Sequence, residues 1–132
     1  MLRLTALATL IALSLIAIGC RHERPVVGPP GQVGHVVICW LKTPGDSAQR
    51  RELIEVSKRF ADLPGVVHVA AGEVLPSKRP VVVSDYDVAV VLTFEDEASL
   101  RAYEAHPRHQ AALRETLRPL TTKVVVYDYV QR

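Results

Sequence analysis

The chain has 132 residues, of which 48% are hydrophobic, 23% charged and 5% aromatic, so it can bury one compact core and is not disordered by composition. The formal net charge is +2, no run of basic residues occurs, and few aromatic side chains are available to stack on bases. These values argue against a nucleic-acid partner.

The first twenty residues predict localisation to the cell envelope. A short positive start, Met1-Leu2-Arg3, precedes an apolar run from Leu4 to Ile18 that ends at Gly19-Cys20. Small residues before a cysteine resemble the lipobox of bacterial lipoproteins. We therefore expect residues 1–19 to be a signal peptide and Cys20 to be lipidated. The alternative is an uncleaved anchor helix, although the run is short of the roughly 20 residues that span a bilayer.

Residues 20–32 are expected to form the lipidated cysteine and a tether rich in proline and glycine. The protein would then be a membrane-anchored lipoprotein on the periplasmic side. Arg21 follows the cysteine, in place of the aspartate that retains lipoproteins in the inner membrane, and this favours the outer membrane. Residues 33–132 remain for one domain.

Apolar alternation and turn residues in this domain predict the order βαββαβ, with the second helix split in two by Pro107. This order is typical of an α+β, ferredoxin-like fold with an antiparallel sheet and helices on one face. The expected segments are strands at Val33–Lys42, Val66–Leu75, Tyr86–Phe94 and Lys123–Val130, a helix capped by Asp46 or Ser47 and stopped by Pro64-Gly65, and helices after Glu97 and from Pro107.

The strands are apolar on both faces, whereas the helices can cover only one. An exposed apolar sheet is unfavourable in water, so we expect a second copy to cover it and form a homodimer, a dimeric α/β barrel. Cys39 lies in the apolar run of the first strand, where we expect a buried free thiol and no disulfide with Cys20.

The stretch from Leu100 to His109 concentrates side chains that exchange protons. His109 shares a helix face with apolar residues and should point to the sheet, and His35 from the first strand could point toward the same helices. Together with Tyr103 they could line an apolar pocket, which suits acid–base chemistry. The alternatives are a structural hydrogen bond for His35 and a helix-capping role for His106.

Several of these segments resemble the stress-responsive A/B barrel (Dabb) family, whose members are dimeric barrels of ferredoxin-like subunits. The likeness rests on Gly34-His35-Val36-Val37, Leu63-Pro64-Gly65-Val66, Tyr86-Asp87 with Thr93-Phe94, Tyr103 with His106-Pro107-Arg108-His109, and Tyr127-Asp128-Tyr129. The family includes plant stress-associated proteins and a few polyketide cyclases. In those cyclases the residues matching Tyr103 and His109 act in proton transfer, and the one matching His35 lines the cavity.

Two functions follow as expectations. The first is an exported Dabb-domain protein that binds a small apolar or aromatic molecule, with His35 and His106 as ligand contacts and a role in stress response. The alternative is an acid–base enzyme resembling the cyclases, for aldol-type cyclisation or isomerisation, with His109 and Tyr103 as catalytic residues. No cofactor or metal is expected, because the chain lacks a phosphate-binding glycine loop and a clustered ligand set. Asp87 and Asp128 are expected to cap strand ends or face water.

Overall fold

The computed structural model describes residues 28–132, so the expected signal peptide, Cys20 and most of the tether lie outside the described residues. In chain order the elements are β1 (Val33–Leu41), α1 (Ser47–Lys58), η1 (Arg59–Asp62), β2 (Val66–Glu73), β3 (Val88–Phe94), α2 (Glu97–Ala105), α3 (Pro107–Ala112), η2 (Leu113–Leu117), α4 (Arg118–Leu120) and β4 (Thr121–Val130). No helix within the described part of the chain is long and apolar enough to cross a membrane.

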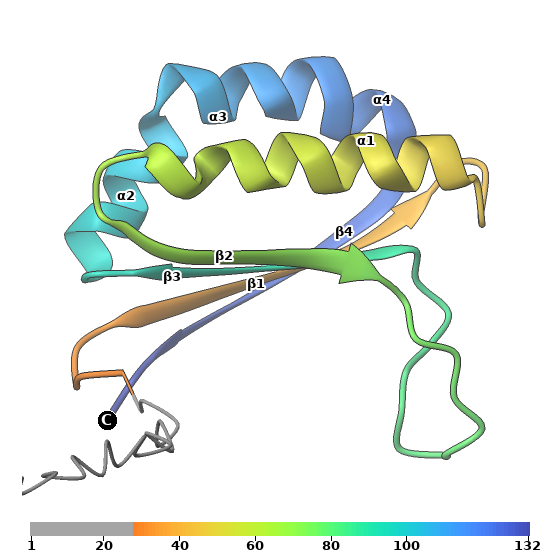
Figure 1. Cartoon of the computed structure of the whole chain (residues 1–132), viewed down its shortest axis with the longest axis horizontal. Coiled ribbons are helices and arrows are strands. Elements are labelled where there is room, and N and C mark those ends of the chain that lie inside the picture. Colours follow the sequence, from red (N-terminus) through yellow and green to blue (C-terminus); the bar gives the residue numbers. More distant parts are fainter. Residues whose placement is uncertain (1–27) are drawn as a thin grey trace, which may run out of the picture.

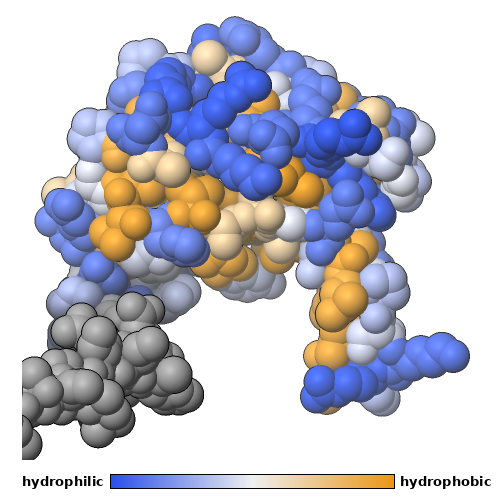
Figure 2. Space-filling model, viewed as in Figure 1, coloured by the Kyte–Doolittle hydropathy of each residue, from blue (hydrophilic) through white to orange (hydrophobic). Residues whose placement is uncertain are grey.

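The four strands form one antiparallel sheet in the order β2-β3-β1-β4, and all helices lie on one face of it (Figure 1). This confirms the expected ferredoxin-like α+β fold. Two strands are shorter than the sequence predicts, because β2 ends at Glu73 and β3 begins at Val88. The chain between them, residues 74–87, stands away from the body of the domain (Figure 2).

Strict alternation along β3 divides the sheet into a covered and an open face. Val88, Val90, Leu92 and Phe94 are buried beneath the helices, and the residues between them point the other way. We name the side opposite the helices the open face. It carries the partly or fully exposed side chains of Val36, Ile38, Trp40, Val91, Val125 and Tyr127, which the strand registers place on one side.

The helical segment after β3 breaks where Pro107 predicts. His106 has extended backbone angles of φ −65° and ψ 134°, which end α2, and Pro107 opens α3. A further irregularity was not predicted: residues Leu113–Leu117 form a π-helical turn. Such turns widen a helix locally and often occur beside functional sites.

Asp87 holds the base of the 74–87 segment. Its buried carboxylate accepts hydrogen bonds from the backbone N–H groups of Leu41 at 2.9 Å and Gly45 at 2.8 Å, and from the Arg50 guanidinium at 2.8 Å. Burial alone would raise the pKa of Asp87, but these hydrogen bonds outweigh burial and lower it. Asp87 therefore caps the end of β1, which was one of the two expected roles, and its buried side chain also joins this strand end to Gly45 and α1.

Candidate functional site

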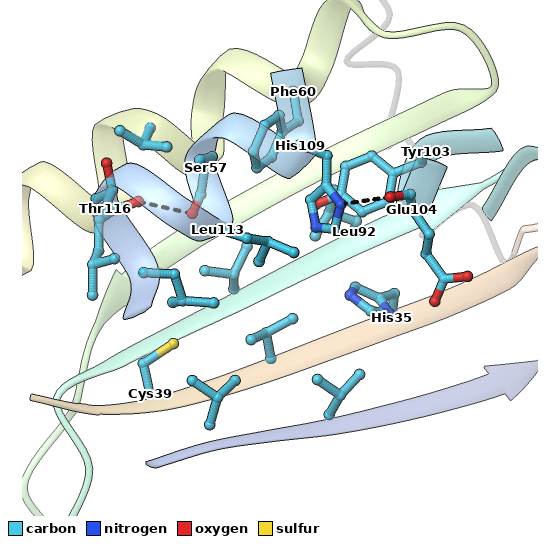
Figure 3. A pocket seen from close by; sticks show the side chains of 18 of the residues that line it. His35, Cys39, Ser57, Phe60, Leu92, Tyr103, Glu104, His109, Leu113 and Thr116 are labelled. Atoms are coloured by element: carbon cyan, nitrogen blue, oxygen red, sulfur yellow. Dashed lines mark hydrogen bonds between the residues drawn. The ribbon is translucent and has the colours of Figure 1, made fainter. Parts of the chain in front are cut away.

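A cavity of about 430 Å³ lies between the helices and the covered face of the sheet. Its walls are mostly aliphatic and aromatic, and one end is formed by His35, Tyr103, Glu104 and His109 (Figure 3). The residues that line it are His35, Val37, Cys39, Leu53, Val56, Ser57, Phe60, Val90, Leu92, Tyr103, Glu104, His109, Ala112, Leu113, Thr116, Leu117, Val124, Val126 and Asp128.

His109 is held in one orientation by the turn that precedes its helix. Its Nδ1 lies 3.1 Å from the backbone carbonyl oxygen of Glu104. Because a carbonyl oxygen can only accept, Nδ1 carries the proton and Nε2 keeps its lone pair when the ring is neutral. Burial, more than any other influence, lowers the pKa of His109, so the neutral ring predominates at pH 7.

Tyr103 is 4% exposed and packs among aromatic rings. Its ring centroid lies 4.3 Å from that of His109, 5.0 Å from Phe94 and 5.4 Å from Phe60. Burial is the main influence on its phenol and raises the pKa of Tyr103, so the hydroxyl keeps its proton. The site therefore places a proton donor beside a proton acceptor.

His35 completes this end of the cavity through a contact that was not expected from the sequence. Its Nδ1 lies 2.6 Å from Oδ1 of Asp128, and its ring centroid is 6.1 Å from that of Tyr103. Asp128 is partly exposed to water, as expected, and the contact with His35 adds an interaction that the sequence did not predict. The signal was present in the alternation of β4, because Val124, Val126 and Asp128 share one face and Asp128 is the direct register partner of His35.

His106 lies apart from this group. Its Nδ1 accepts a hydrogen bond from the backbone N–H of Arg108 at 3.2 Å and so caps α3, and His106 is not among the residues that line the cavity. The structure thus brings together His35, Tyr103 and His109 and leaves out the fourth residue expected there. His106 instead has the helix-capping role that was its alternative interpretation.

Cys39 lies at the other end of the cavity, where it is a buried free thiol as expected. Burial raises the pKa of Cys39 to about 11, so the thiol stays protonated and serves as an apolar wall. Nearby, Ser57 and Thr116 add hydroxyl groups to the lining (Figure 3). Residues 28–132 contain no group of three His, Cys, Asp or Glu side chains placed to hold a metal ion.

Comparison with known proteins identifies the domain. The sequence pattern of the stress-responsive A/B barrel domain matches residues 33–131. The chain belongs to the Dabb family. The resemblance seen in the sequence is therefore confirmed across the whole described sheet, and the tyrosine and histidines of the cavity lie within the matched part of the chain.

Solved structures share the fold at low sequence identity. A Dabb family protein from Mesorhizobium loti is 27% identical with a TM-score of 0.63, and the match covers 77% of this chain and 98% of that chain. A dimeric ferredoxin-like protein from Jannaschia is 26% identical with a TM-score of 0.59, covering 75% and 98%. The hydroxynitrile lyase of Passiflora edulis is 21% identical with a TM-score of 0.67, covering 79% and 96%, which shows the fold alone. No curated protein matches the chain.

Proposed function

We propose that this Dabb domain binds a small, largely apolar or aromatic molecule that carries a carbonyl group. The observation that carries the proposal is the cavity, whose walls are mostly apolar and at one end of which His35, Tyr103 and His109 converge. Its volume of about 430 Å³ falls within the range of small-molecule sites.

The polar end supplies complementary contacts for a carbonyl compound. The protonated phenol of Tyr103 donates to the carbonyl oxygen, and the free Nε2 of neutral His109 faces an adjacent C–H or O–H group. The aliphatic walls accept the remainder of the molecule, where burial of apolar surface stabilises the complex by about 25 cal/mol per Å² before association costs.

A screen of bacterial metabolite extracts tests this binding. The purified protein should retain a defined set of apolar carbonyl compounds that mass spectrometry identifies after washing. His109→Ala should weaken their retention, because it removes the acceptor nitrogen and part of the cavity wall. If the same compounds bind with unchanged affinity to His109→Ala, the proposed role of His109 is wrong.

The second candidate is an acid–base enzyme, favoured by a neutral imidazole and a protonated phenol whose tilted rings have centroids 4.3 Å apart. In this reaction His109 removes a proton from the carbon next to the carbonyl, and Tyr103 stabilises the enolate oxygen. Exchange of these protons for deuterium in 4-phenyl-2-butanone, followed by NMR in D₂O, measures that step without knowledge of the natural substrate. His109→Gln and Tyr103→Phe should each slow exchange about 100-fold or more. Exchange at the rate of buffer alone in the unaltered protein would exclude this candidate.

We infer further that the protein is exported and anchored by acylated Cys20, with a role in envelope stress tolerance. The support is the sequence pattern of residues 1–20 and the tether that follows. Mass spectrometry of membrane-extracted protein should find a chain that begins with diacylated or triacylated Cys20. An unmodified chain that begins at Met1 would contradict the anchor.

We also propose that the protein is a homodimer whose subunits meet at the open face. The support is twofold: the open face carries Trp40, Tyr127 and several aliphatic side chains, and the 26% identical Jannaschia structure is described as dimeric. Covering this surface removes apolar area from water, which is the main stabilising term in such interfaces.

A further inference from the structure

Residues 74–87, which we name the β2–β3 arm, leave the sheet on the side of the open face. Figure 1 shows the arm projecting away from the helices, beyond the plane of the strands. In Figure 2 it stands clear of the domain body, with apolar surface along its length and hydrophilic side chains at its tip. No other connection in the described part of the chain extends this far from the sheet.

The arm exposes the most accessible large apolar side chains of the described chain. Leu75 is 82% exposed, Val81 81% and Val83 67%, whereas the exposed apolar side chains of the strands range from 43% to 62%. Single exposed apolar residues are ordinary on protein surfaces. Three such residues on one projecting segment are unusual. Clusters of exposed apolar side chains mark surfaces that bind a partner.

The arm is held in a defined shape although it has no core of its own. At its base the backbone N–H of Val74 donates to the carbonyl oxygen of Asp87 at 3.1 Å, and Asp87 is fixed by the network described above. Near its tip the backbone N–H of Val82 donates to the carbonyl oxygen of Arg79 at 3.0 Å. Ser84 Oγ donates to the carbonyl oxygen of Ser77 at 3.4 Å across the arm. A preformed segment loses less conformational entropy on binding than a flexible one.

We propose that the β2–β3 arm clasps the second copy of this chain in the homodimer. The proposal rests on the open-face dimer proposed above. A sheet packed on the open face would lie about 10 Å below it, on the side to which the arm projects. The arm would then lie along the flank of the partner subunit and bury Leu75, Val81 and Val83, while Lys78 and Arg79 at its tip remain in the solvated rim.

Charged substitutions on the arm test this role. In the full-length chain in detergent, Val81→Asp combined with Val83→Asp should raise the dimer dissociation constant by about tenfold or more, measured by sedimentation. Ala102→Asp is the matched control, since Ala102 is exposed on α2, across the sheet from the arm, and should leave the dissociation constant unchanged. Circular dichroism should show unaltered folding in both variants, because none of these side chains belongs to the core.

The possible results distinguish a failure of the proposed clasp from a failure of the proposed dimer. A monomeric unaltered chain would overturn both the open-face dimer and the clasp. A dimer whose dissociation constant is unchanged by the two arm substitutions would overturn the clasp and leave the dimer standing.

Photo-crosslinking identifies what the arm contacts. With Val81 replaced by the photo-reactive amino acid p-benzoylphenylalanine, irradiation of the full-length protein in its membrane should link two copies of the chain. Adducts to lipid, to a different protein or to residues 1–27 of the same chain would each contradict the clasp.

Discussion

At His109, one hydrogen bond decides which ring nitrogen is available. The carbonyl oxygen of Glu104 lies 3.1 Å from Nδ1 and holds the proton there, so Nε2 alone can accept a proton or a hydrogen bond. The tight turn at Pro107 places that carbonyl beside the ring, five residues earlier in the chain. The helix break at Pro107 therefore determines which nitrogen of the His109 ring carries the proton.

The buried, neutral state of His109 makes stability depend on pH. Its pKa in the folded protein lies below the ordinary value of 6.5, so the unfolded chain takes up the proton first as the pH falls. The stabilising contribution is complete above pH 6.5 and is lost as the pH falls through the folded pKa. Denaturant unfolding of His109→Gln should therefore show a weaker loss of stability on acidification below pH 6.5 than the unaltered protein. The control is His68→Gln, at an exposed position of β2, which should keep the original dependence of the unfolding free energy on pH. If His109→Gln also keeps that dependence, the ring is not buried in its neutral form.

Asp87 is the residue on which the turn after β1 depends. Asp87→Asn keeps the shape of the side chain but places an amide where donors from Leu41, Gly45 and Arg50 converge. We expect a loss of about 3 kcal/mol in the free energy of unfolding, because the Arg50 guanidinium loses its charged partner and at least one backbone N–H group meets an NH₂ group in place of an acceptor. The exposed Asp62→Asn should cost less than about 1 kcal/mol, since its pair with Arg108 lies at the surface. Equal effects of the two substitutions would contradict this assignment.

Three of the four pocket residues expected from the sequence meet in the cavity. They could be predicted because helices and strands direct their side chains with a fixed period. The helical stripe of His109 and the strand alternation of His35 fix the direction of each side chain without knowledge of the partner. The pairing of His35 with Asp128 depends on the register between β1 and β4, which lie far apart in sequence. His106 was ambiguous because a residue next to a helix break can face either the cavity or its own backbone.

Among the elements, the turn at Gly65 joins η1, β2 and the start of α2. Gly65 has φ +78°, and its backbone carbonyl accepts from the N–H of Glu95 at 2.9 Å. A Cβ atom there would lie 2.5 Å from Cβ of Ser99. Both the left-handed backbone and the close approach of α2 require the absence of a side chain.

Gly65→Ala should lower the free energy of unfolding by about 2–3 kcal/mol, because strain in the backbone and crowding against Ser99 act together. Gly72→Ala provides the control within the neighbouring strand, since a Cβ atom at Gly72 would approach no atom beyond its chain neighbours within 4 Å, and the φ of Gly72 is not in the left-handed region. That variant should change stability by less than about 1 kcal/mol. Chemical denaturation compares the two, and equal losses would refute the steric argument.

The order of elements could be predicted because each strand and helix carries its own periodic pattern. The π-helical turn at Leu113–Leu117 could not, because its apolar residues fit an ordinary helix equally well. The length of the β2–β3 arm was also underestimated. The predicted strands include Leu75 and Tyr86, because apolar and aromatic residues fit a strand pattern when their exposure is unknown.

For the whole molecule, the open face makes a monomer unfavourable. Tyr127 is 62% exposed although it lies beside other apolar side chains of the sheet. Light scattering of residues 28–132 at micromolar concentration should give twice the mass of one chain. Ile38→Asp should shift the protein towards monomers, because it places a charge at the middle of the open face. A monodisperse monomer for the unaltered fragment would contradict the dimer.

Ligand binding in the cavity is tested most directly by filling it. The measurement is calorimetric titration of residues 28–132 with acetophenone, 4-phenyl-2-butanone and 2-heptanone. The test variant is Ala112→Leu, which extends a side chain into the cavity, and the control is Ala102→Leu on the exposed side of α2. We predict that at least one of these ketones binds the unaltered protein and the Ala102→Leu variant with equal affinity, and that Ala112→Leu weakens binding by about tenfold or more. Absence of binding by all three ketones, or equal affinity for Ala112→Leu, would contradict a ligand site between the helices and the sheet.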